Sequence, residues 1–498
     1  MSFPQTERRT FEGLVSELDQ ALRRELDSLR PRLTGRIIFP QDKDYDLSRR
    51  VYNGRFDPHP AAIIYCESED DLRQCLRAIK SAGVPFRLRS GGHSVAGHSA
   101  CDGIMIDLTG LNDLAADPIG LVADVGSGCP QGKLEQLLGV HGLQLPLGDA
   151  PDVTVAGFMQ GGGWGIVSRT FGMNCDNVVQ ARVMLADGRI VQASETINHD
   201  LWWAIRGGTG GNFGVLLSIR YALHRAPEVN YWSLSWPLSR DSERGNAVTV
   251  LLELQKLARD GSAQMNAAAL AVFTAEKEGN VPQAPWLVLW GAFVGTKSDM
   301  IAALRALLLV PGCVHGFTQA PIASRTTAFY RESRYVSSPL DAANWRAILE
   351  CFLASPNPFS VLQIHTMGGA INAYPCEKSA FIHRTAAFNI FLDTFWRNEV
   401  EKCAAQSFLT GWCNLMKPFW NGHIYQNFPS ASVPDYRWNY WGNAFSALLG
   451  VKQKYDPDGL FDFPQMVAPR DGKRESAEWP PEVVGFLLRP IEFAESCG

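Results

Sequence analysis

The sequence lacks long hydrophobic runs, and neither sign of charge predominates strongly. No stretch reaches the roughly 18 apolar residues of a membrane-spanning helix, and the first residues lack the apolar core of a secretory signal. Lys and Arg number 46 against 51 Asp and Glu, which leaves a formal net charge of −5 without any long basic run. We therefore expect a cytoplasmic protein with no nucleic-acid and no membrane partner.

Several common site motifs are missing as well. The eleven cysteines form no C-x-x-C pair, so no metal site is expected, and isolated thiols are read as small buried hydrophobes in a reducing compartment. The dinucleotide spacing G-x-G-x-x-G fails at Gly126 and at Gly208, and the phosphate loop of nucleotide hydrolases fails because Leu134 follows Lys133. H-E-x-x-H and G-x-S-x-G do not occur.

What is present is a globular composition, with 46% hydrophobic and 19% charged residues. A chain of this length is expected to form about two or three domains. Helical spacing of apolar residues predicts an N-terminal helix over 8–32. Short strands and helices then alternate, with a capped helix after Ser68 and a hairpin at Asp187-Gly188. Trp-rich strands and Ala/Leu-rich helices follow over 228–420.

Glycine is concentrated in three clusters, at residues 87–98 (RLRSGGHSVAGH), 153–177 and 206–214 (RGGTGGNFG). Consecutive glycines allow backbone N–H groups to converge on an anion, because no Cβ blocks its approach. Four glycines within 161–165 exclude the interior of a stable helix or strand. The clusters predict loops that a flat or charged ligand approaches closely, and a pyrophosphate suits the first of them.

Together the three clusters resemble the FAD-binding domain of the vanillyl-alcohol oxidase superfamily, and within it the berberine bridge enzyme-like oxidases. The similarity extends from about Pro40 to Val467, through R-S-G-G-H at 89–93, Gly161–Arg169, Gly172–Asn177, Asp200–Gly214 and Tyr440–Phe461.

The resemblance implies an α+β fold with a PCMH-type FAD-binding domain, made of two α/β subdomains, and a substrate domain with an antiparallel sheet backed by helices. The expected parts are an N-terminal helix (1–35), the FAD-binding domain (36–225), the substrate-binding domain (226–420), a segment that returns to the FAD domain (421–467) and a tail (468–498).

In this family a histidine after two glycines is joined covalently to the 8α-methyl group of FAD, and that role falls on His93. Many relatives form a second link through a cysteine, but Ala150 stands at that position, so we expect a single link; Cys129 and Cys175 are the nearest thiols. Further cofactor-binding positions implied by the resemblance are Arg89, Ser90, Gly91, Gly92, Ser94, Gly97, His98, Thr154, Gly157, Gly161, Gly162, Gly165, Asn177, Val179, Gly211, Gly214, Val215 and Asn427.

The resemblance also implies transfer of a hydride from a substrate C–H to flavin N5, with O2 as electron acceptor and H2O2 as product. Strand alternation places Gln363 and His365 on one face, and Tyr425 matches a tyrosine that assists deprotonation, provided that a neighbour lowers the pKa of its phenol. Trp164, Trp286 and Trp290 are the expected pocket aromatics.

The expected substrate is an alcohol, amine or activated C–H compound among hydrophobic secondary metabolites. Three alternatives remain open from the sequence: a carbohydrate oxidase of the same family, a flavin-dependent oxygenase and a non-catalytic flavin-binding protein. His365 and Tyr425 are also compatible with ordinary packing roles in a protein core.

Overall fold

The structure is a computed structural model that describes residues 23–226, 228–274, 284–315, 327–433 and 435–469. Most of the predicted N-terminal helix and nearly all of the predicted tail, 468–498, lie outside the described residues. Residues 23–29 are helical, as expected, and continue into the short helix η1 (Arg30–Arg32). Within these ranges no helix combines the length and the apolar character needed to cross a bilayer.

The first part of the chain builds a small sheet in the order β1-β2-β4-β3. Its strands are β1 (Arg36–Ile38), β2 (Ala62–Tyr65), β3 (Phe86–Arg89) and β4 (Ile104–Asp107). Strands β2 and β3 run parallel to β4, which requires a crossover helix, here α3 (Glu69–Ala82). The Ser68 hydroxyl accepts a hydrogen bond from the Asp71 backbone N–H, so the predicted helix cap is confirmed.

A second sheet follows, with five antiparallel strands in the order β5-β6-β10-β8-β9. The strands are β5 (Leu114–Asp117), β6 (Val122–Gly126), β8 (Val178–Met184), β9 (Ile190–Ser194) and β10 (Val215–Ala222). Its helices are α4 (Gln131–Val140), α5 (Val155–Gln160) and α7 (His199–Ile205). The predicted hairpin is confirmed between β8 and β9, where Gly188 has a φ of +82° that a side chain would disfavour.

The third sheet has seven strands, all paired antiparallel, in the order β15-β12-β14-β13-β17-β18-β16. The strands are β12 (Val229–Pro237), β13 (Met265–Thr274), β14 (Ala284–Val294), β15 (Val314–His315), β16 (Ala328–Val336), β17 (Val361–Thr366) and β18 (Phe388–Trp396). The helices that cover it are α8 (Asp241–Asp260), α9 (Lys297–Leu308), α10 (Ala342–Leu353) and α12 (Glu399–Met416).

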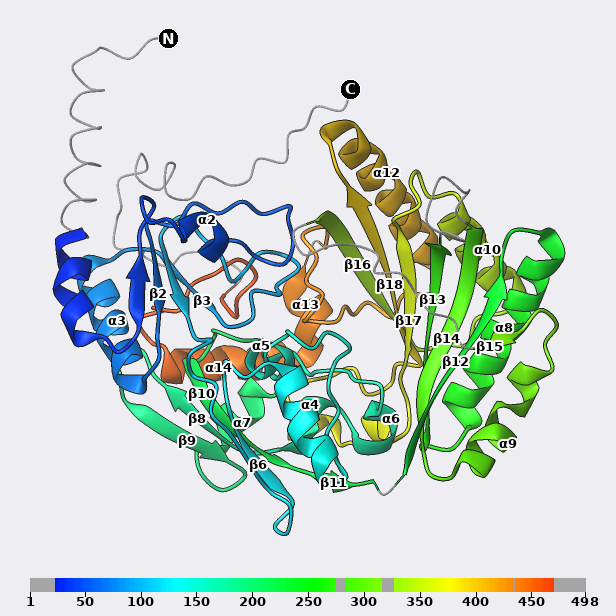
Figure 1. The fold of residues 1–498 in the computed structure, drawn as a ribbon, viewed down its shortest axis with the longest axis horizontal. Helices are drawn as coiled ribbons and strands as arrows, with labels where there is room; N and C mark the ends of the chain where they lie inside the picture. The colour runs from blue at the N-terminus through cyan, green and yellow to red at the C-terminus, as the bar shows by residue number, and fades with distance from the viewer. Residues whose placement is uncertain (1–22, 227, 275–283, 316–326, 434, 470–498) are drawn as a thin grey trace.

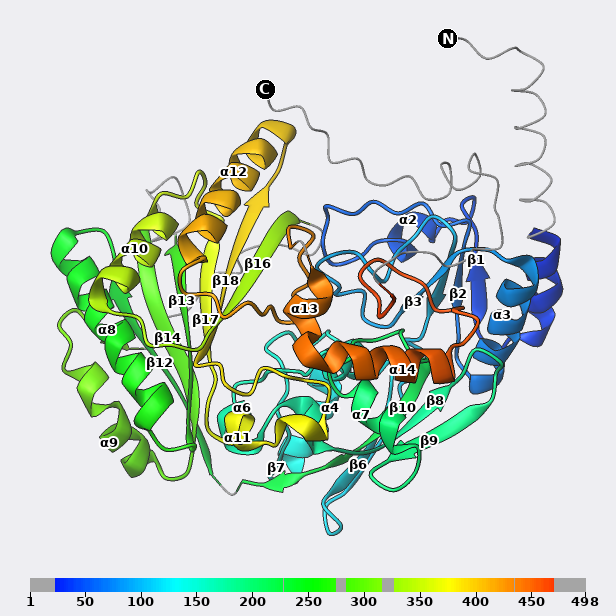
Figure 2. The same ribbon diagram turned by 180° about the vertical axis from the view of Figure 1, so that it is seen from behind.

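Figures 1 and 2 show these four helices on the outer face of the large sheet, while its inner face is turned toward the rest of the protein. A core that includes Trp236, Trp345 and Trp412 fills the layer between sheet and helices. An antiparallel sheet backed by helices was predicted, and it is confirmed. Because the outer face is fully covered, the inner face is the one that remains for a site.

After α12 the chain crosses back to the first two sheets (Figure 2). It forms α13 (Tyr436–Trp441) and α14 (Phe445–Tyr455), and α14 packs against α7. The buried Lys452 ammonium fixes this return, because it donates to the backbone oxygens of Asn212 and Phe461 and pairs with Asp456. The segment that carries Tyr425 is thereby held beside the glycine-rich loops.

The remaining elements are short connections. They are α2 (Tyr45–Ser48), β7 (Leu143–Gln144), α6 (Ser168–Phe171), η2 (Asn174–Asn177), β11 (His224–Arg225), α11 (Ala370–Ala373), η3 (Cys376–Lys378) and η4 (Gly442–Ala444).

Candidate active site

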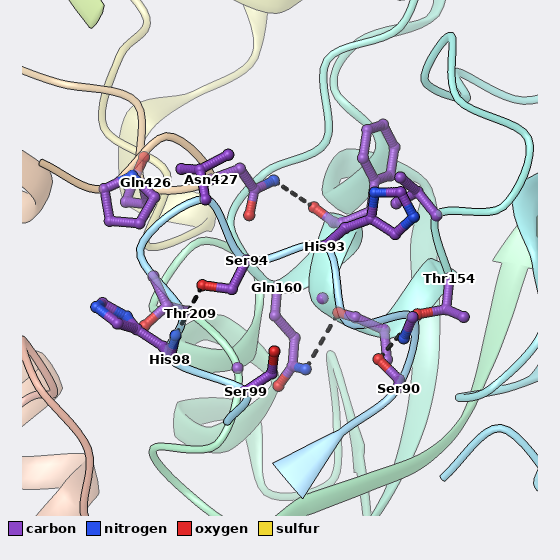
Figure 3. A pocket seen from close by; sticks show the side chains of 18 of the residues that line it. Ser90, His93, Ser94, His98, Ser99, Thr154, Gln160, Thr209, Gln426 and Asn427 are labelled. Atoms are coloured by element: carbon purple, nitrogen blue, oxygen red, sulfur yellow. Dashed lines mark hydrogen bonds between the residues drawn. The ribbon is translucent and has the colours of Figure 1, made fainter. Parts of the chain in front are cut away.

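One cavity of about 560 Å³ draws its lining from all three sheets and from the returning segment. Glycine-rich loops over 90–95, 148–158 and 209–216 form part of the wall, the large sheet contributes Arg331, Gln363, His365 and Phe391, and residues 425–429 complete it. Figure 3 shows the polar side chains of the loop side converging on this space. The volume lies within the range of about 300–1,000 Å³ that is usual for small-molecule sites.

The first glycine cluster begins where β3 ends and is held by the loop before α5. The Gly91 N–H donates to the Thr154 hydroxyl, which in turn donates to the Ser90 hydroxyl, at 2.9 and 2.8 Å (Figure 3). Gly92 has a φ of +70°, a conformation that L side chains rarely adopt. This requirement explains the second glycine and directs the following residue, His93, along the cavity wall.

His93 is held on two sides. Its Nε2 lies 3.0 Å from a carboxylate oxygen of Asp152, and its ring stacks on Tyr52 with 4.5 Å between ring centroids and 26° between planes. These two contacts fix both the position and the rotation of the imidazole. The contact with Asp152 engages Nε2, so the carboxylate orients the imidazole ring at the cavity wall.

The loop side of the cavity fits an oxygen-rich cofactor. The Ser99 hydroxyl and the Gln131 side-chain N–H group are buried on this wall, without a hydrogen-bond partner in the described part of the chain. A Cβ placed on Gly157 would meet nothing within 4 Å, so this lining glycine leaves open space beside the backbone. Buried polar groups normally have partners, and these donors match the phosphate, ribose and ring oxygens of FAD.

Most of the predicted cofactor-binding positions lie on this lining. They are Ser90, Gly91, Gly92, His93, Ser94, His98, Thr154, Gly157, Gly211, Gly214, Val215 and Asn427. Burial, with a smaller contribution from Arg87, lowers the pKa of His98 to about 4, so this imidazole is neutral near pH 7.

Arg89 and Gly97, by contrast, do not line the cavity. Arg89 is buried and pairs with Asp107 at 2.5 Å while it donates to the Ser48 carbonyl, so it anchors the end of β3. Gly97 is required by packing, since a Cβ there would lie 2.7 Å from the Phe56 ring. Both residues therefore have structural roles in the described part of the chain, and a cofactor contact at either stays a prediction.

The glycines of the second cluster also serve chain packing more than cofactor contact. A Cβ on Gly161 would lie 2.1 Å from the Asn427 side chain, one on Gly162 would lie 2.6 Å from Phe381, and one on Gly165 would lie 2.2 Å from the Leu147 carbonyl. None of the three lines the cavity. Their missing side chains let the loop pass close to the returning segment, which places Tyr425 and Asn427.

Asn177 and Val179 also lie outside the cavity lining. The Asn177 amide donates to the carbonyls of Phe171 and Met173, so it closes a turn. Val179 follows the buried Val178 on β8 and is 39% exposed, because strand alternation directs its side chain to the opposite face.

On the sheet side, β17 brings Gln363 and His365 to the cavity, as the alternation predicted. His365 is 6% exposed, and neither ring nitrogen has a hydrogen-bond partner among the described residues. Its ring stacks on Trp164 at 3.7 Å and 8°, and the Trp164 indole N–H donates to the Thr366 carbonyl. Burial, reinforced by Arg331, holds the pKa of His365 well below 6.5, so the imidazole is neutral.

This burial makes the stability of the protein depend on pH. Below pH 6.5 the unfolded chain protonates His365 and the folded protein does not, so the free energy of unfolding falls as the pH drops from about 6.5. Replacing His365 by Phe should reduce this slope by about 1.4 kcal/mol per pH unit. Urea denaturation between about pH 5 and 7 measures the slope.

Phe391→Leu is the matched control for this measurement, because it alters the same cavity wall without removing a titratable group. It should lower the midpoint at every pH and leave the slope unchanged. An unchanged slope in His365→Phe would show that His365 titrates alike in the folded and unfolded chains.

Tyr425 is buried where the second glycine cluster meets the returning segment. Its hydroxyl oxygen accepts hydrogen bonds from the backbone N–H groups of Gly163 and Trp164 and from the Asn427 amide, all at 3.0 Å. Three donors on one oxygen match a phenolate better than a phenol. Burial nevertheless dominates and raises the pKa of Tyr425 to about 12, so these three donors do not bring it below its usual value.

Of the three expected pocket tryptophans, only Trp164 lines the cavity. Trp286 and Trp290 lie on β14, which β13 separates from β17. Both are partly buried and pack against a cluster that includes Val95 and Leu270. Neither lines the cavity, because strand alternation predicts the face of a sheet and not the distance of a strand from the site.

Several lining residues were not predicted from the sequence. They are Tyr52, Ser99, Gln131, Arg331, Phe391 and Phe428. None belongs to a motif, and Arg331 and Phe391 reach the cavity from strands that pair only in the folded sheet. The available sequence signal was the alternation of side chains along 328–336 and 388–396. It predicts which side chains share a face of the sheet, but not which of them line the cavity.

Comparison with known proteins agrees with this geometry. A family described as FAD binding domain matches residues 60–194, and one described as berberine and berberine like matches residues 424–468. An uncharacterized FAD-linked oxidoreductase, YvdP, of Bacillus subtilis is 28% identical over 461 residues, covering 88% of this chain and 98% of its own. Reticuline oxidase of Eschscholzia californica is 26% identical over 493 residues, covering 87% and 89%.

Among solved structures, a berberine bridge enzyme-like protein from Physcomitrella patens superposes with a TM-score of 0.78. It shares 24% sequence identity, and the match covers 91% of this chain and 99% of that one. This likeness establishes the fold, and it confirms the predicted α+β architecture of the PCMH type.

The class of the protein follows from these findings: it is an FAD-linked oxidoreductase that acts on small molecules. More narrowly, residues 60–194 match an FAD binding domain and residues 424–468 match a berberine and berberine like region, and the relatives include berberine bridge enzyme-like proteins and a reticuline oxidase. The non-catalytic alternative is therefore set aside.

Proposed function

We propose that this protein is an oxidase that carries FAD on a single covalent link to His93 and takes a hydride from a hydrophobic small molecule. The observation that carries the proposal is the placement of His93, His365 and Tyr425 on one cavity, with the glycine-rich loops on its other side. FAD supplies the two-electron acceptor, which O2 reoxidises with release of H2O2.

Two observations support the single link. The His93 imidazole is oriented by Asp152 and Tyr52 and borders the cavity. Ala150 also borders the cavity, and its methyl group offers no sulfur for a thioether. The other cofactor contacts that we propose are the lining positions given above, together with Ser99 and Gln131.

Two residues are candidates for accepting the substrate proton. Tyr425 has three N–H donors that stabilise its phenolate, although burial keeps the resting side chain protonated. His365 is neutral and has unpartnered ring nitrogens in the described structure, but burial makes it a weak base. We propose that Tyr425 accepts the proton and that His365 and Gln363 bind the substrate; the three donors on the Tyr425 oxygen support this proposal.

The walls favour a hydrophobic substrate over a sugar. The large-sheet side of the cavity carries the aromatic rings of Trp164, Phe391 and Phe428, whereas most of the polar lining lies on the side of the glycine-rich loops. Stacking on such rings does not by itself satisfy the many hydroxyl groups of an oligosaccharide, which must be hydrogen-bonded when buried.

A substrate screen tests the function. The purified protein is mixed without oxygen with panels of aromatic alcohols, amines, conjugated phenols and oligosaccharides, and loss of the oxidised flavin absorbance is recorded. We expect reduction by a member of the hydrophobic panels, followed by stoichiometric peroxide when O2 is admitted. Reduction by oligosaccharides alone would contradict the substrate class, and incorporation of isotopic O2 into the product without peroxide would indicate an oxygenase.

A further inference from the structure

Arg331, on the edge strand β16, presents part of its guanidinium group to the cavity. Its Nε and Nη2 atoms donate to the two carboxylate oxygens of Asp393, both at 2.5 Å, and the arginine side chain is 15% exposed. The second terminal nitrogen, Nη1, forms no hydrogen bond with any described residue, although Arg331 lines the cavity. The guanidinium group is therefore held rigidly, and its Nη1 atom can still donate a hydrogen bond to a ligand.

Aromatic rings surround this donor. The guanidinium carbon lies 4.4 Å from the centroid of the Phe428 ring and 5.1 Å from that of Phe391, and the two rings are 4.7 Å apart. Both rings line the cavity. Because they limit the access of water, a hydrogen bond to Arg331 is stronger here than at the protein surface.

A neighbouring polar side chain on the same wall, His365, has no hydrogen-bond partner among the described residues. Strands β16, β18 and β17 lie side by side, so Arg331 pairs in register with Asp393, and Gln363 with Phe391. His365 follows Gln363 on the same face of β17, with both ring nitrogens unpartnered within the described ranges and only 6% of its surface exposed. A row of polar groups set in an aromatic wall is costly unless a ligand satisfies it.

We propose that Arg331 anchors the substrate through an acceptor oxygen, and that the substrate is an aryl or otherwise conjugated compound carrying a carbonyl, phenolate or carboxylate group. The inference rests on the proposed function, since it places the substrate against the large sheet and FAD against the glycine-rich loops. It goes beyond that function by fixing the chemical group that is recognised and the residue that recognises it.

Asp393 determines whether Arg331 binds a neutral or a negatively charged group. Because its carboxylate balances the guanidinium, the pair is close to neutral, so a carbonyl oxygen is bound as well as an anion. The planar aromatic walls select the conjugated body, and Arg331 then fixes its orientation. No proton, electron or covalent bond is transferred at Arg331, which is a binding residue.

Three probes of similar shape separate these contributions: benzoate, acetophenone and ethylbenzene. Each is titrated into the purified flavin-containing protein, with flavin absorbance and tryptophan fluorescence as independent readouts, since Trp164 also borders the cavity. Acetophenone should bind at least about tenfold more tightly than ethylbenzene, because a hydrogen bond to a charged group is gained. Comparing the affinities of benzoate and acetophenone shows whether the site binds an anion or a carbonyl oxygen more tightly.

Substitutions test whether Arg331 causes the differences in affinity between the probes. Arg331→Lys keeps the charge but loses the forked geometry, so it should weaken acetophenone and benzoate by about tenfold and leave ethylbenzene unchanged. Asp393→Asn leaves the guanidinium uncompensated and should strengthen benzoate binding selectively. Arg220→Lys is the matched control, because Arg220 forms the same bidentate pair with Asp124 on the surface.

Equal affinities for acetophenone and ethylbenzene would overturn the proposal, as would a parallel loss of all three probes in Arg331→Lys. If Arg331→Lys fails to fold, the opposite shift expected for benzoate in Asp393→Asn decides the question. Loss of the proposed function is recognised separately, by the absence of flavin bound covalently to the denatured chain, and in that case tryptophan fluorescence still reports probe binding.

Discussion

Replacing His93 by alanine should abolish covalent flavin completely. The wild-type chain should carry a fluorescent flavin band through denaturing electrophoresis, and the variant none, because no other group on the described cavity wall combines a nucleophilic ring with the support of Asp152 and Tyr52. His93 would hold the flavin through a C–N bond that replaces one C–H bond of the 8α-methyl group and the N–H bond of the imidazole; two protons would be released, and the flavin would supply the acceptor for the two electrons, with O2 as the final oxidant.

His98→Ala is the matched control for this experiment. His98 belongs to the same loop and lines the same cavity, but its ring makes neither of the two contacts that orient His93. The control should retain the fluorescent band. Proteolysis of the wild-type chain should yield one flavin-bearing peptide, which contains His93; a second peptide from the Cys129 or Cys175 region would refute the single link, and a band that persists in His93→Ala would refute the attachment site.

Replacing Tyr425 by phenylalanine should slow flavin reduction by about 10²- to 10⁴-fold, the usual contribution of a positioned general base. Because the pKa of Tyr425 is raised to about 12, its phenolate form is scarce at pH 7 and increases with pH. The wild-type reduction rate should therefore rise by about tenfold per pH unit below that value. The variant should lose both the rate and this slope.

Stopped-flow reduction without oxygen, at saturating concentrations of a substrate found in the screen, measures both quantities. His365→Phe serves as the comparison, since it removes the other candidate base from the cavity: we expect weaker substrate binding with the same pH slope. A wild-type rate that is flat from pH 7 upward, or a slope that survives in Tyr425→Phe, would transfer the base role to His365.

Local chemistry made much of the fold and part of the site predictable. The Ser68 cap, the Asp187-Gly188 hairpin and the faces of β17 each depend on a few adjacent residues, so the sequence predicts them well. The role of His93 was assigned differently, through the resemblance of R-S-G-G-H at 89–93 to the family sequence, because paired glycines are equally compatible with an ordinary tight turn.

Long-range packing accounts for the failures. The motif around Gly161 and Gly165 was interpreted as cofactor contact, whereas these glycines make room for Asn427 and the Leu147 carbonyl. Nothing local distinguishes the two roles, since both need a missing side chain. Arg331 was not predicted as a site residue, because its proposed role depends on Asp393. Asp393 lies 62 residues further along the chain and contacts Arg331 because strands β16 and β18 pair in the sheet.

The position of Tyr425 also has a consequence for biosynthesis. Its hydroxyl is held by the N–H groups of Gly163 and Trp164, about 260 residues earlier in the chain. As a nascent polypeptide leaves the ribosome, the glycine-rich loops emerge long before the strand ends and the tyrosine that close the cavity around them. Completion of the cavity is thereby tied to completed translation, because a chain that ends before Tyr425 lacks the phenol that accepts these two hydrogen bonds.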